Sequence, residues 1–338
     1  MIKLDWNDIS IIPETLSSIS SRSEINPHLD GKLPLFTAPM DTVIDETNID
    51  EFEKNNINIC LPRNVKYDTI KNDNYFYSYG LDEIIDILES NSNLPKKVLI
   101  DIANGHMLKL YETSKQIKDK YGDNIELMVG NIANPDTYTK FCEIGVDYIR
   151  VGIGGGSACT TSANVAIHYP MASLIKECKD RSYGWDKPTK IIADGGFKNF
   201  SDIIKALAMG ADYVMLGGIF NKCLESCGEN YTINTSNGIP ITLEEAIKRF
   251  NSNFIVYKYY RGMSTKEVQK SWNRLELKTG EGISKFNEVE YTLSGWIENF
   301  TDYLKSAMSY TGCRTLEEYC GEVQWIQISQ NAFNRFNK

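Results

Sequence analysis

The stretch KIIADGGFKNFSDIIKALAMGADYVMLGG, residues 190–218, decides the fold. Its two ends, 190–194 and 212–217, are short apolar runs rich in β-branched residues, and each run leads into glycines. Between them Ser201 is a candidate N-cap, apolar residues follow at helical spacing, and Gly210 ends the helix. A strand, a helix and a second strand in this order predict a parallel βαβ unit.

The same pattern recurs along the chain, because short apolar runs alternate with stretches of helical periodicity. The eight runs that we interpret as strands are 33–38, 57–61, 75–79, 98–102, 125–130, 146–152, 190–194 and 212–217. Eight parallel strands alternating with helices predict an α/β fold, the TIM (β/α)8 barrel. Periodicity alone is compatible with a doubly wound sheet as well, but the repetition favours the barrel.

Three parts of the chain lie outside this rhythm. Residues 1–32 hold turn formers and are interpreted as an N-terminal arm that caps the barrel. Residues from about 218 to 294 are polar and too long for an ordinary βα connection, so they predict an excursion after the eighth strand. The barrel is expected to resume with a helix over 295–312 and a final strand over 322–329. We therefore predict one catalytic domain, 1–338.

Composition narrows the class of protein. The 338 residues include 36 Lys and Arg against 45 Asp and Glu, a net charge of -9, which argues against binding of a long nucleic acid through a basic surface. A small anionic ligand stays compatible with this charge. The N-terminus has no apolar segment of signal-peptide length, and no run approaches the roughly 18 apolar residues of a membrane span. We expect a cytoplasmic protein.

A glycine-rich segment follows the sixth predicted strand and carries a thiol. The sequence YIRVGIGGGSACTT, residues 148–161, places Cys159 in a loop at a strand end, where barrel enzymes keep catalytic groups. Buried packing is the usual role of a single cysteine, but this position makes Cys159 the candidate nucleophile. Ser157 stands where a Rossmann fingerprint would need its third glycine, which disfavours dinucleotide binding by that motif. The glycine carbonyls could hold a monovalent cation, or the glycines could simply let the loop move.

The loops after strands seven and eight are candidates for an anion site. Strand seven ends in Asp194, Gly195 and Gly196, and strand eight in Gly217 and Gly218. Glycines let the backbone approach a phosphate closely, although tight βα turns would need the same residues. Asp101, at the end of strand four, is either an acidic group at the barrel mouth or a cap of the next helix.

These segments resemble the IMP dehydrogenase and GMP reductase family. The resemblance is carried by FTAPMDTV (36–43), DIANGH (101–106), VGNI (129–132), VGIGGGSACTT (151–161), residues 193–218, YKYYRGMS (257–264) and the final WIQIS (325–329). It implies a TIM barrel, usually a homotetramer, that binds a purine nucleotide and a nicotinamide dinucleotide. No nucleic-acid polymer and no membrane are implied as partners.

The resemblance also implies a role for each matching residue. Cys159 would attack purine C2, and Asp101, Asn104 and Gly105 would contact the nicotinamide cofactor. The nucleotide would be bound by Ser157, Asp194, Gly196, Gly217, Gly218, Gly262, Met263 and Ser264. Backbone carbonyls of Gly154, Gly156 and Cys159 would hold a monovalent cation such as K+. Pro39 stands where many GMP reductases have Asn, so the chain departs from the family pattern at that contact.

Several features favour the reductase within this family. A short stretch separates the second and third predicted strands, so the CBS regulatory modules that many dehydrogenases insert there are not expected. The flap, residues 262–281, is short, and Arg274 is followed by Leu275 instead of the tyrosine of the dehydrogenases' water-activating pair. Thr161 and Glu281 match the reductase residues that handle ammonia. Thr161 by itself does not distinguish the two, and without the resemblance Glu281 would be a solvated charge.

The resemblance thus predicts an NADPH-dependent GMP reductase that works through a covalent bond between Cys159 and purine C2. The first alternative is an IMP dehydrogenase that oxidises IMP to XMP with NAD and water. The second alternative is a catalytically silent barrel that binds nucleotides.

Overall fold

A closed barrel of eight parallel strands forms the centre of the molecule. The computed structural model describes residues 2–90, 92, 94–234, 237–271 and 280–336. The strands are β2 (Leu35–Thr37), β3 (Cys60–Leu61), β4 (Phe76–Tyr79), β5 (Lys97–Asp101), β6 (Glu126–Ile132), β7 (Tyr148–Val151), β8 (Lys190–Asp194) and β9 (Tyr213–Leu216). They lie in the order β2-β9-β8-β7-β6-β5-β4-β3, and a parallel bridge between Phe36 and Asn58 closes the circle. The prediction of a TIM barrel is confirmed.

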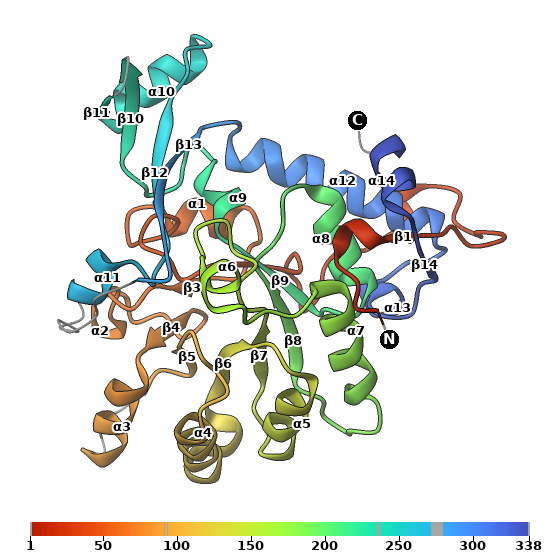
Figure 1. The fold of residues 1–338 in the computed structure, drawn as a ribbon, viewed down its shortest axis with the longest axis horizontal. Coiled ribbons are helices and arrows are strands. Elements are labelled where there is room, and N and C mark those ends of the chain that lie inside the picture. The colour runs from red at the N-terminus through yellow and green to blue at the C-terminus, as the bar shows by residue number, and fades with distance from the viewer. Residues whose placement is uncertain (1, 91, 93, 235–236, 272–279, 337–338) are drawn as a thin grey trace.

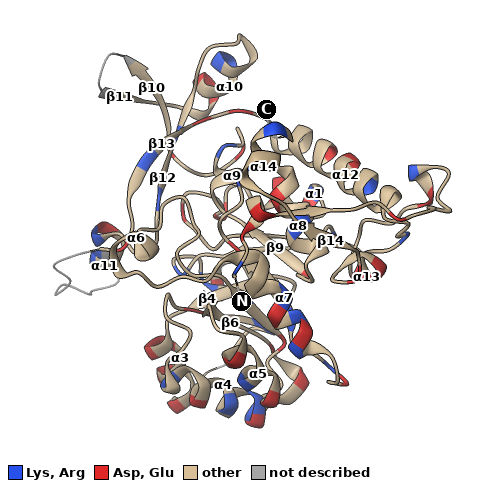
Figure 2. Ribbon diagram, turned by 45° about the vertical axis from the view of Figure 1, so that its right-hand side comes forward, with Lys and Arg blue, Asp and Glu red and all other residues tan. Residues whose placement is uncertain are grey.

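Helices surround the barrel (Figure 1). They are α1 (Ile49–Lys54), α2 (Tyr67–Ile70), α3 (Leu81–Glu89), α4 (Leu108–Tyr121), α5 (Pro135–Glu143), α6 (Thr161–Val165), α7 (Met171–Ser182), α8 (Phe200–Ala208) and α9 (Gly218–Asn221). The outer helices α4 and α5 carry both acidic and basic residues, whereas all charged residues of α3 are acidic (Figure 2). No helix within the described ranges is long and apolar enough to cross a membrane.

The start of α8 differs from the prediction. Its N-cap is Asn199, whose side-chain oxygen accepts a hydrogen bond from the Asp202 backbone N–H at 3.1 Å. The proposed cap, Ser201, therefore lies in the first turn and is wrong as an N-cap. Asn and Ser are similarly good N-caps, and Asn199 lies only two positions before Ser201, so residue type alone does not distinguish them.

Aromatic rings fill the barrel interior. Phe36, Phe76, Tyr148 and Tyr213 come from four different strands, β2, β4, β7 and β9, and their ring centroids lie 5.1 to 6.2 Å apart. Rings on strands β4 and β7, which are not neighbours in the sheet, can touch only across the inside of the barrel. Side chains therefore fill the interior of the barrel, and an open ligand site can exist only at one end of the barrel.

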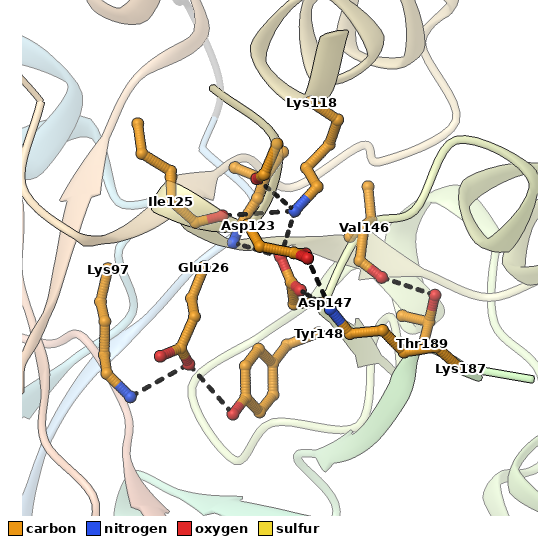
Figure 3. Close-up of polar contacts among 12 residues, drawn as sticks. Lys97, Lys118, Asp123, Ile125, Glu126, Val146, Asp147, Tyr148, Lys187 and Thr189 are labelled. Atoms are coloured by element: carbon orange, nitrogen blue, oxygen red, sulfur yellow. Dashed lines mark hydrogen bonds and ion pairs between the residues drawn. The ribbon is translucent and has the colours of Figure 1, made fainter. Parts of the chain in front are cut away.

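A polar cluster stabilises the amino-terminal end of the strands (Figure 3). The Lys118 ammonium donates to the Asp147 carboxylate at 2.8 Å, and the side chains of both residues are about nine-tenths buried. The same carboxylate accepts from the Leu127 backbone N–H at 2.9 Å, which ties the start of β7 to β6. This end of a barrel contributes to stability, and the site must be sought at the other end.

The excursion after the eighth strand folds as a small antiparallel sheet that projects from the barrel (Figure 1). Its strands are β10 (Asn230–Asn234), β11 (Asn237–Ile241), β12 (Tyr257–Arg261) and β13 (Ser284–Glu288), in the order β11-β10-β12-β13. Helix α10 (Leu243–Asn251) packs on it through a separate small core of Leu224, Ala246, Val256 and Val289. Strands β12 and β13 hold the two ends of the flap, which includes α11 (Lys266–Ser271).

The last predicted strand does not return to the barrel. Its central residues form β14 (Trp325–Gln327), which pairs antiparallel with β1 (Ile9–Ile11) of the N-terminal arm. That part of the prediction is wrong, because an alternating sequence identifies a strand but not its partner. The segment before β14 is helical, with α12 (Leu293–Tyr310) and α13 (Leu316–Tyr319), and α14 (Gln330–Phe336) follows it.

Candidate active site

A cavity of about 670 Å³ opens at the carboxyl ends of the barrel strands. It gathers nearly all of the residues that the sequence singled out. Its lining includes Asp101, Asn104, Gly154, Gly156, Ser157, Cys159, Thr161, Asp194, Gly196, Gly217, Gly218, Gly262, Met263, Ser264 and Glu281. Gly105 is the exception. Its N–H donates to the Asn131 carbonyl at 2.8 Å, and a β-carbon there would meet that oxygen at 2.5 Å, so Gly105 supports the loop from behind.

Cys159 begins a chain of hydrogen bonds that reaches the flap. Its thiol lies 3.2 Å from the Thr161 hydroxyl, which donates to the Glu281 carboxylate at 2.5 Å. Glu281 is 120 residues from Thr161 in the sequence, and only the folded flap brings the two together. A thiol, a hydroxyl and a carboxylate in contact form a path along which a proton can move.

The flap and the cysteine loop are joined through their backbones. The Thr160 N–H donates to the Glu281 carbonyl at 2.9 Å, and the Ile283 N–H donates to the Ala158 carbonyl at 3.0 Å. A β-carbon on Gly262 would lie 2.7 Å from the Ala158 carbonyl oxygen, so only glycine permits this approach. The Glu281 carboxylate therefore reaches Thr161 from a backbone that is itself fixed to the cysteine loop.

Glycine loops and hydroxyl groups converge beside the thiol. A β-carbon on Gly218 would lie 3.0 Å from the Ser157 hydroxyl and 3.7 Å from that of Tyr260. The loop after β8 packs directly on the cysteine loop, because a β-carbon on Gly195 would lie 3.1 Å from the Gly156 nitrogen. Two hydroxyls and exposed backbone around a small space are suited to a phosphate.

A buried arginine organises the floor of the cavity. Arg150, on β7, donates to the Asp101 carboxylate at 2.5 Å and to the Asp194 carboxylate at 2.8 Å. The amide of Asn131 also donates to Asp194, at 2.7 Å. Burial disfavours the charge of Arg150, but the attraction of Asp194 and Asp101 outweighs it, so the pKa of Arg150 lies above its ordinary value. Asp101 therefore does not cap a helix; α4 has its N-cap at Met107.

The predicted cation ligands also make hydrogen bonds within their loop. The Gly154 carbonyl accepts from the Ser162 hydroxyl at 3.1 Å, and the Gly156 carbonyl accepts from the Cys159 N–H at 2.9 Å. A carbonyl oxygen has two lone pairs, so each could also face an ion. The cation site stays a prediction.

The outer end of the cavity runs between the loops after β4 and β5. Leu81, Met107 and Lys109 line it beyond Asp101, and the Lys109 ammonium pairs with Asp82 at 3.0 Å. This part offers apolar surface and an exposed charge, a combination suited to an elongated anionic ligand. Arg274 and Leu275, which entered the comparison of flaps, lie outside the described residues.

Comparison with known proteins agrees with this geometry. The model of the IMP dehydrogenase / GMP reductase domain matches residues 92–239 and 241–336. The chain belongs to this family. It is 29% identical to a GMP reductase of Buchnera aphidicola subsp. Schizaphis graminum over 99% of its own length and 98% of that protein's. A GMP reductase of Phytophthora infestans is 26% identical over 100% of the chain and 94% of its own length.

A dehydrogenase relative matches a smaller part. The chain is 33% identical to the inosine-5'-monophosphate dehydrogenase of Cryptosporidium parvum over 241 residues, which is 69% of the chain and 54% of that relative. The chain thus spans about half the length of this relative but nearly the whole length of the reductases. Members of this family are oxidoreductases, and we conclude that the chain is an oxidoreductase as well.

Sequence reasoning missed four residues of this family site. Arg150 was detectable as a charged residue inside an apolar barrel strand, and Asn131 as an amide directly after the predicted strand 125–130. Tyr260 lies in a run of tyrosines in which nothing distinguishes the one that faces Gly218. Lys109 is one of several lysines on α4, and only the cavity shows that it differs from the others.

Proposed function

We propose that the chain is a GMP reductase, which converts GMP to IMP and ammonia and oxidises a reduced nicotinamide cofactor. The observation that carries the proposal is the chain of contacts from the Cys159 thiol through the Thr161 hydroxyl to the Glu281 carboxylate. It supplies a nucleophile for purine C2 and a proton path for the departing amine at one point in the cavity. The reductase relatives that match the chain over almost its full length support the same reaction.

The cavity supports a defined orientation of the nucleotide. Ser157, Gly196, Gly217 and Gly218 would hold the phosphate, and the Tyr260 hydroxyl lies close enough to join them. Asp194, held by Arg150 and Asn131, would accept from a ribose hydroxyl through its second oxygen. Gly262, Met263 and Ser264 would line the purine, whose C2 then faces Cys159.

The reaction follows from these groups. The Cys159 sulfur adds to C2 while its thiol proton passes through the Thr161 hydroxyl to the Glu281 carboxylate. The same path then returns this proton to the exocyclic amine, the C2–N bond breaks, and the amine leaves as ammonia. A thioimidate between Cys159 and C2 remains. A nicotinamide cofactor, when bound, supplies the hydride that replaces sulfur at C2. The C2–S bond then breaks, IMP leaves, and the sulfur is regenerated as a thiolate.

We further propose that the cofactor is NADPH. Asp101 and Asn104 would flank the nicotinamide, Gly105 would hold their loop, and the rest of the molecule would lie along the outer cavity. Lys109, an exposed cation that pairs with Asp82, would supply the positive charge for a 2'-phosphate. A K+ ion on the carbonyls of Gly154, Gly156 and Cys159 and a homotetramer are carried over from the family as parts of the same proposal. The cytoplasmic location expected from the sequence is a further part of it.

The second candidate is an IMP dehydrogenase, and the identity to the Cryptosporidium enzyme favours it. Two assays on the purified protein separate the candidates, both followed by nicotinamide absorbance: GMP with NADPH, and IMP with NAD. Oxidation of NADPH with release of ammonia supports the reductase. Formation of NADH without any turnover of GMP would replace it by the dehydrogenase, and no reaction in either assay would indicate the silent barrel.

A further inference from the structure

A buried polar cluster lies where the flap joins the barrel, and its centre is Asn221. This residue is fully buried and is the last residue of α9, the short helix that begins directly after Gly217. Strand β12 passes on one side of Asn221 and leads into Gly262 at one end of the flap. Strand β13 begins at Ser284, three residues after Glu281. Asn221 therefore lies between the loop at Gly217 and Gly218 and the two strands that lead to the flap.

The hydrogen bonds of Asn221 join three separate segments. Its amide nitrogen donates to the Thr42 carbonyl at 2.8 Å, in the loop after β2, and to the Tyr259 carbonyl at 3.1 Å, on β12. Its amide oxygen accepts from the side-chain amide of Asn287, on β13, at 2.8 Å. Asn287 is 7% exposed, so water cannot readily replace this bond.

Close packing leaves the cluster little freedom. A β-carbon on Gly228 would lie 2.7 Å from the Tyr259 carbonyl oxygen and 3.0 Å from the Asn221 amide nitrogen, so a segment of backbone covers the cluster. The Ser226 hydroxyl donates to the Asn221 carbonyl at 2.9 Å, and the buried Lys258 ammonium donates to the Ser226 carbonyl at 2.6 Å. The Asn221 side chain is therefore held closely between the loop after β2 and strands β12 and β13.

We propose that the Asn221–Asn287 pair positions Glu281 for catalysis and couples it to the loop at Gly217 and Gly218. A nucleotide phosphate on that loop fixes the start of α9, α9 fixes Asn221, and the pair then holds β13, which carries Glu281 to Thr161. Neither asparagine lines the cavity, so both are positioning residues. The inference rests on the role of Glu281 in the proposed function.

The alternative is that the pair only satisfies buried backbone groups of the small sheet. That sheet has its own support, because neither the backbone pairing of β12 with β13 nor the core at Val256 and Val289 involves the side chain of Asn221 or Asn287. A purely structural pair would change the melting temperature when it is removed. A positioning pair would also change kcat, since displacement of a catalytic group by about 1 Å can cost about a hundredfold in rate.

The experiment compares three variants of the whole protein: Asn287→Ala, Asn221→Ala and the control Asn48→Ala. Asn48 is also buried, at 6% exposure, and its amide donates to the Val43 and Glu225 carbonyls, both at 3.0 Å. We expect both pair variants to lower kcat for GMP by about tenfold or more while the KM for GMP changes less than threefold. The doubly substituted protein should be no slower than Asn221→Ala, because the two residues act through one contact. The control should melt lower at unchanged kcat.

Amide hydrogen exchange gives a readout that does not need turnover. With GMP or IMP as the probe, the wild-type protein should exchange more slowly at residues 282–288, and Asn287→Ala should lose this protection while it still binds nucleotide. If Asn221→Ala does not fold, Asn287→Ala carries the test, since it leaves the bonds from Asn221 to Thr42 and Tyr259 in place. Unchanged kcat and unchanged protection in Asn287→Ala would overturn the proposal.

The two proposals can fail separately. If wild-type protein does not reduce GMP but nucleotide protects 282–288 through Asn287, the coupling stands and the proposed function falls. If wild-type protein reduces GMP and Asn287→Ala reduces it equally fast, the proposed function stands and the coupling falls.

Discussion

Replacement of Glu281 by glutamine tests the proton path most simply. The Glu281 carboxylate accepts the Thr161 hydroxyl at 2.5 Å, and that hydroxyl in turn lies 3.2 Å from the thiol. Glutamine keeps the size of the side chain and can still bond to Thr161, but it cannot give up or take a proton. The backbone contacts of residue 281, which join the flap to the cysteine loop, do not involve the side chain and should persist.

The expected magnitude follows from the loss of one acid–base group. Such groups contribute about 10² to 10⁴ in rate, so Glu281→Gln should lower kcat by about this factor, or about 3 to 5 kcal/mol of barrier. The KM for GMP should change little, because the phosphate and ribose contacts lie on other loops. The assay is NADPH oxidation at saturating GMP, with Glu288→Gln, at the far end of β13, as the control. A kcat for Glu281→Gln within threefold of the wild type would refute the reasoning.

Three further predictions concern other parts of the molecule. Lys109→Ala should weaken the binding of NADPH, measured by fluorescence titration, about tenfold more than the binding of NADH. The control Lys115→Ala, on the same helix, should alter the binding of neither cofactor. Equal losses of affinity for both cofactors in Lys109→Ala would contradict the role of Lys109. Burial lowers the pKa of Lys258 to about 8 from 10.5, so the folded protein binds fewer protons than the unfolded chain between these values and its stability should rise with pH there. Between pH 8 and 10.5, the free energy of unfolding of the wild type, measured with urea, should rise by about 3 kcal/mol relative to that of Lys258→Met. A difference between the two proteins that does not change with pH would show that Lys258 does not titrate as described. Asp147→Ala should lower the free energy of unfolding in urea by about 3 kcal/mol, because the Lys118 ammonium stays buried without the carboxylate that pairs with it. The kcat of the folded protein should not change. An unaltered urea midpoint would exclude a stabilising role for the Lys118–Asp147 pair.

The barrel was predictable because its signals are local. Each barrel strand is a short apolar run bounded by turn residues, and the eight predicted runs overlap the eight observed strands. The small sheet was missed as a sheet because its strands are polar or rich in tyrosine and depend on each other for pairing. Strand β14 shows the same limit, since its sequence predicted a strand but its partner, β1, lies more than 300 residues away.

The residues of the site also divide into those that local sequence could predict and those whose contacts depend on the fold. Cys159 and the glycine loops could be placed at strand ends from local sequence, and the family resemblance added Thr161 and Glu281. Local sequence could not predict that Glu281 contacts Thr161, because this contact depends on how β12 and β13 place the flap against the cysteine loop. Nor could it identify Arg150 as the link between Asp101 and Asp194, since that link joins side chains from three different strands, β5, β7 and β8.

The proposed covalent bond between Cys159 and purine C2 is open to one direct measurement. The protein is mixed with GMP and NADPH, quenched in acid during turnover, digested, and analysed by mass spectrometry. The account predicts that the peptide containing Cys159 gains the mass of GMP less ammonia, and that the other seven cysteines stay unmodified. Turnover of GMP with no such adduct on Cys159, or with undiminished rate in Cys159→Ala, would contradict it.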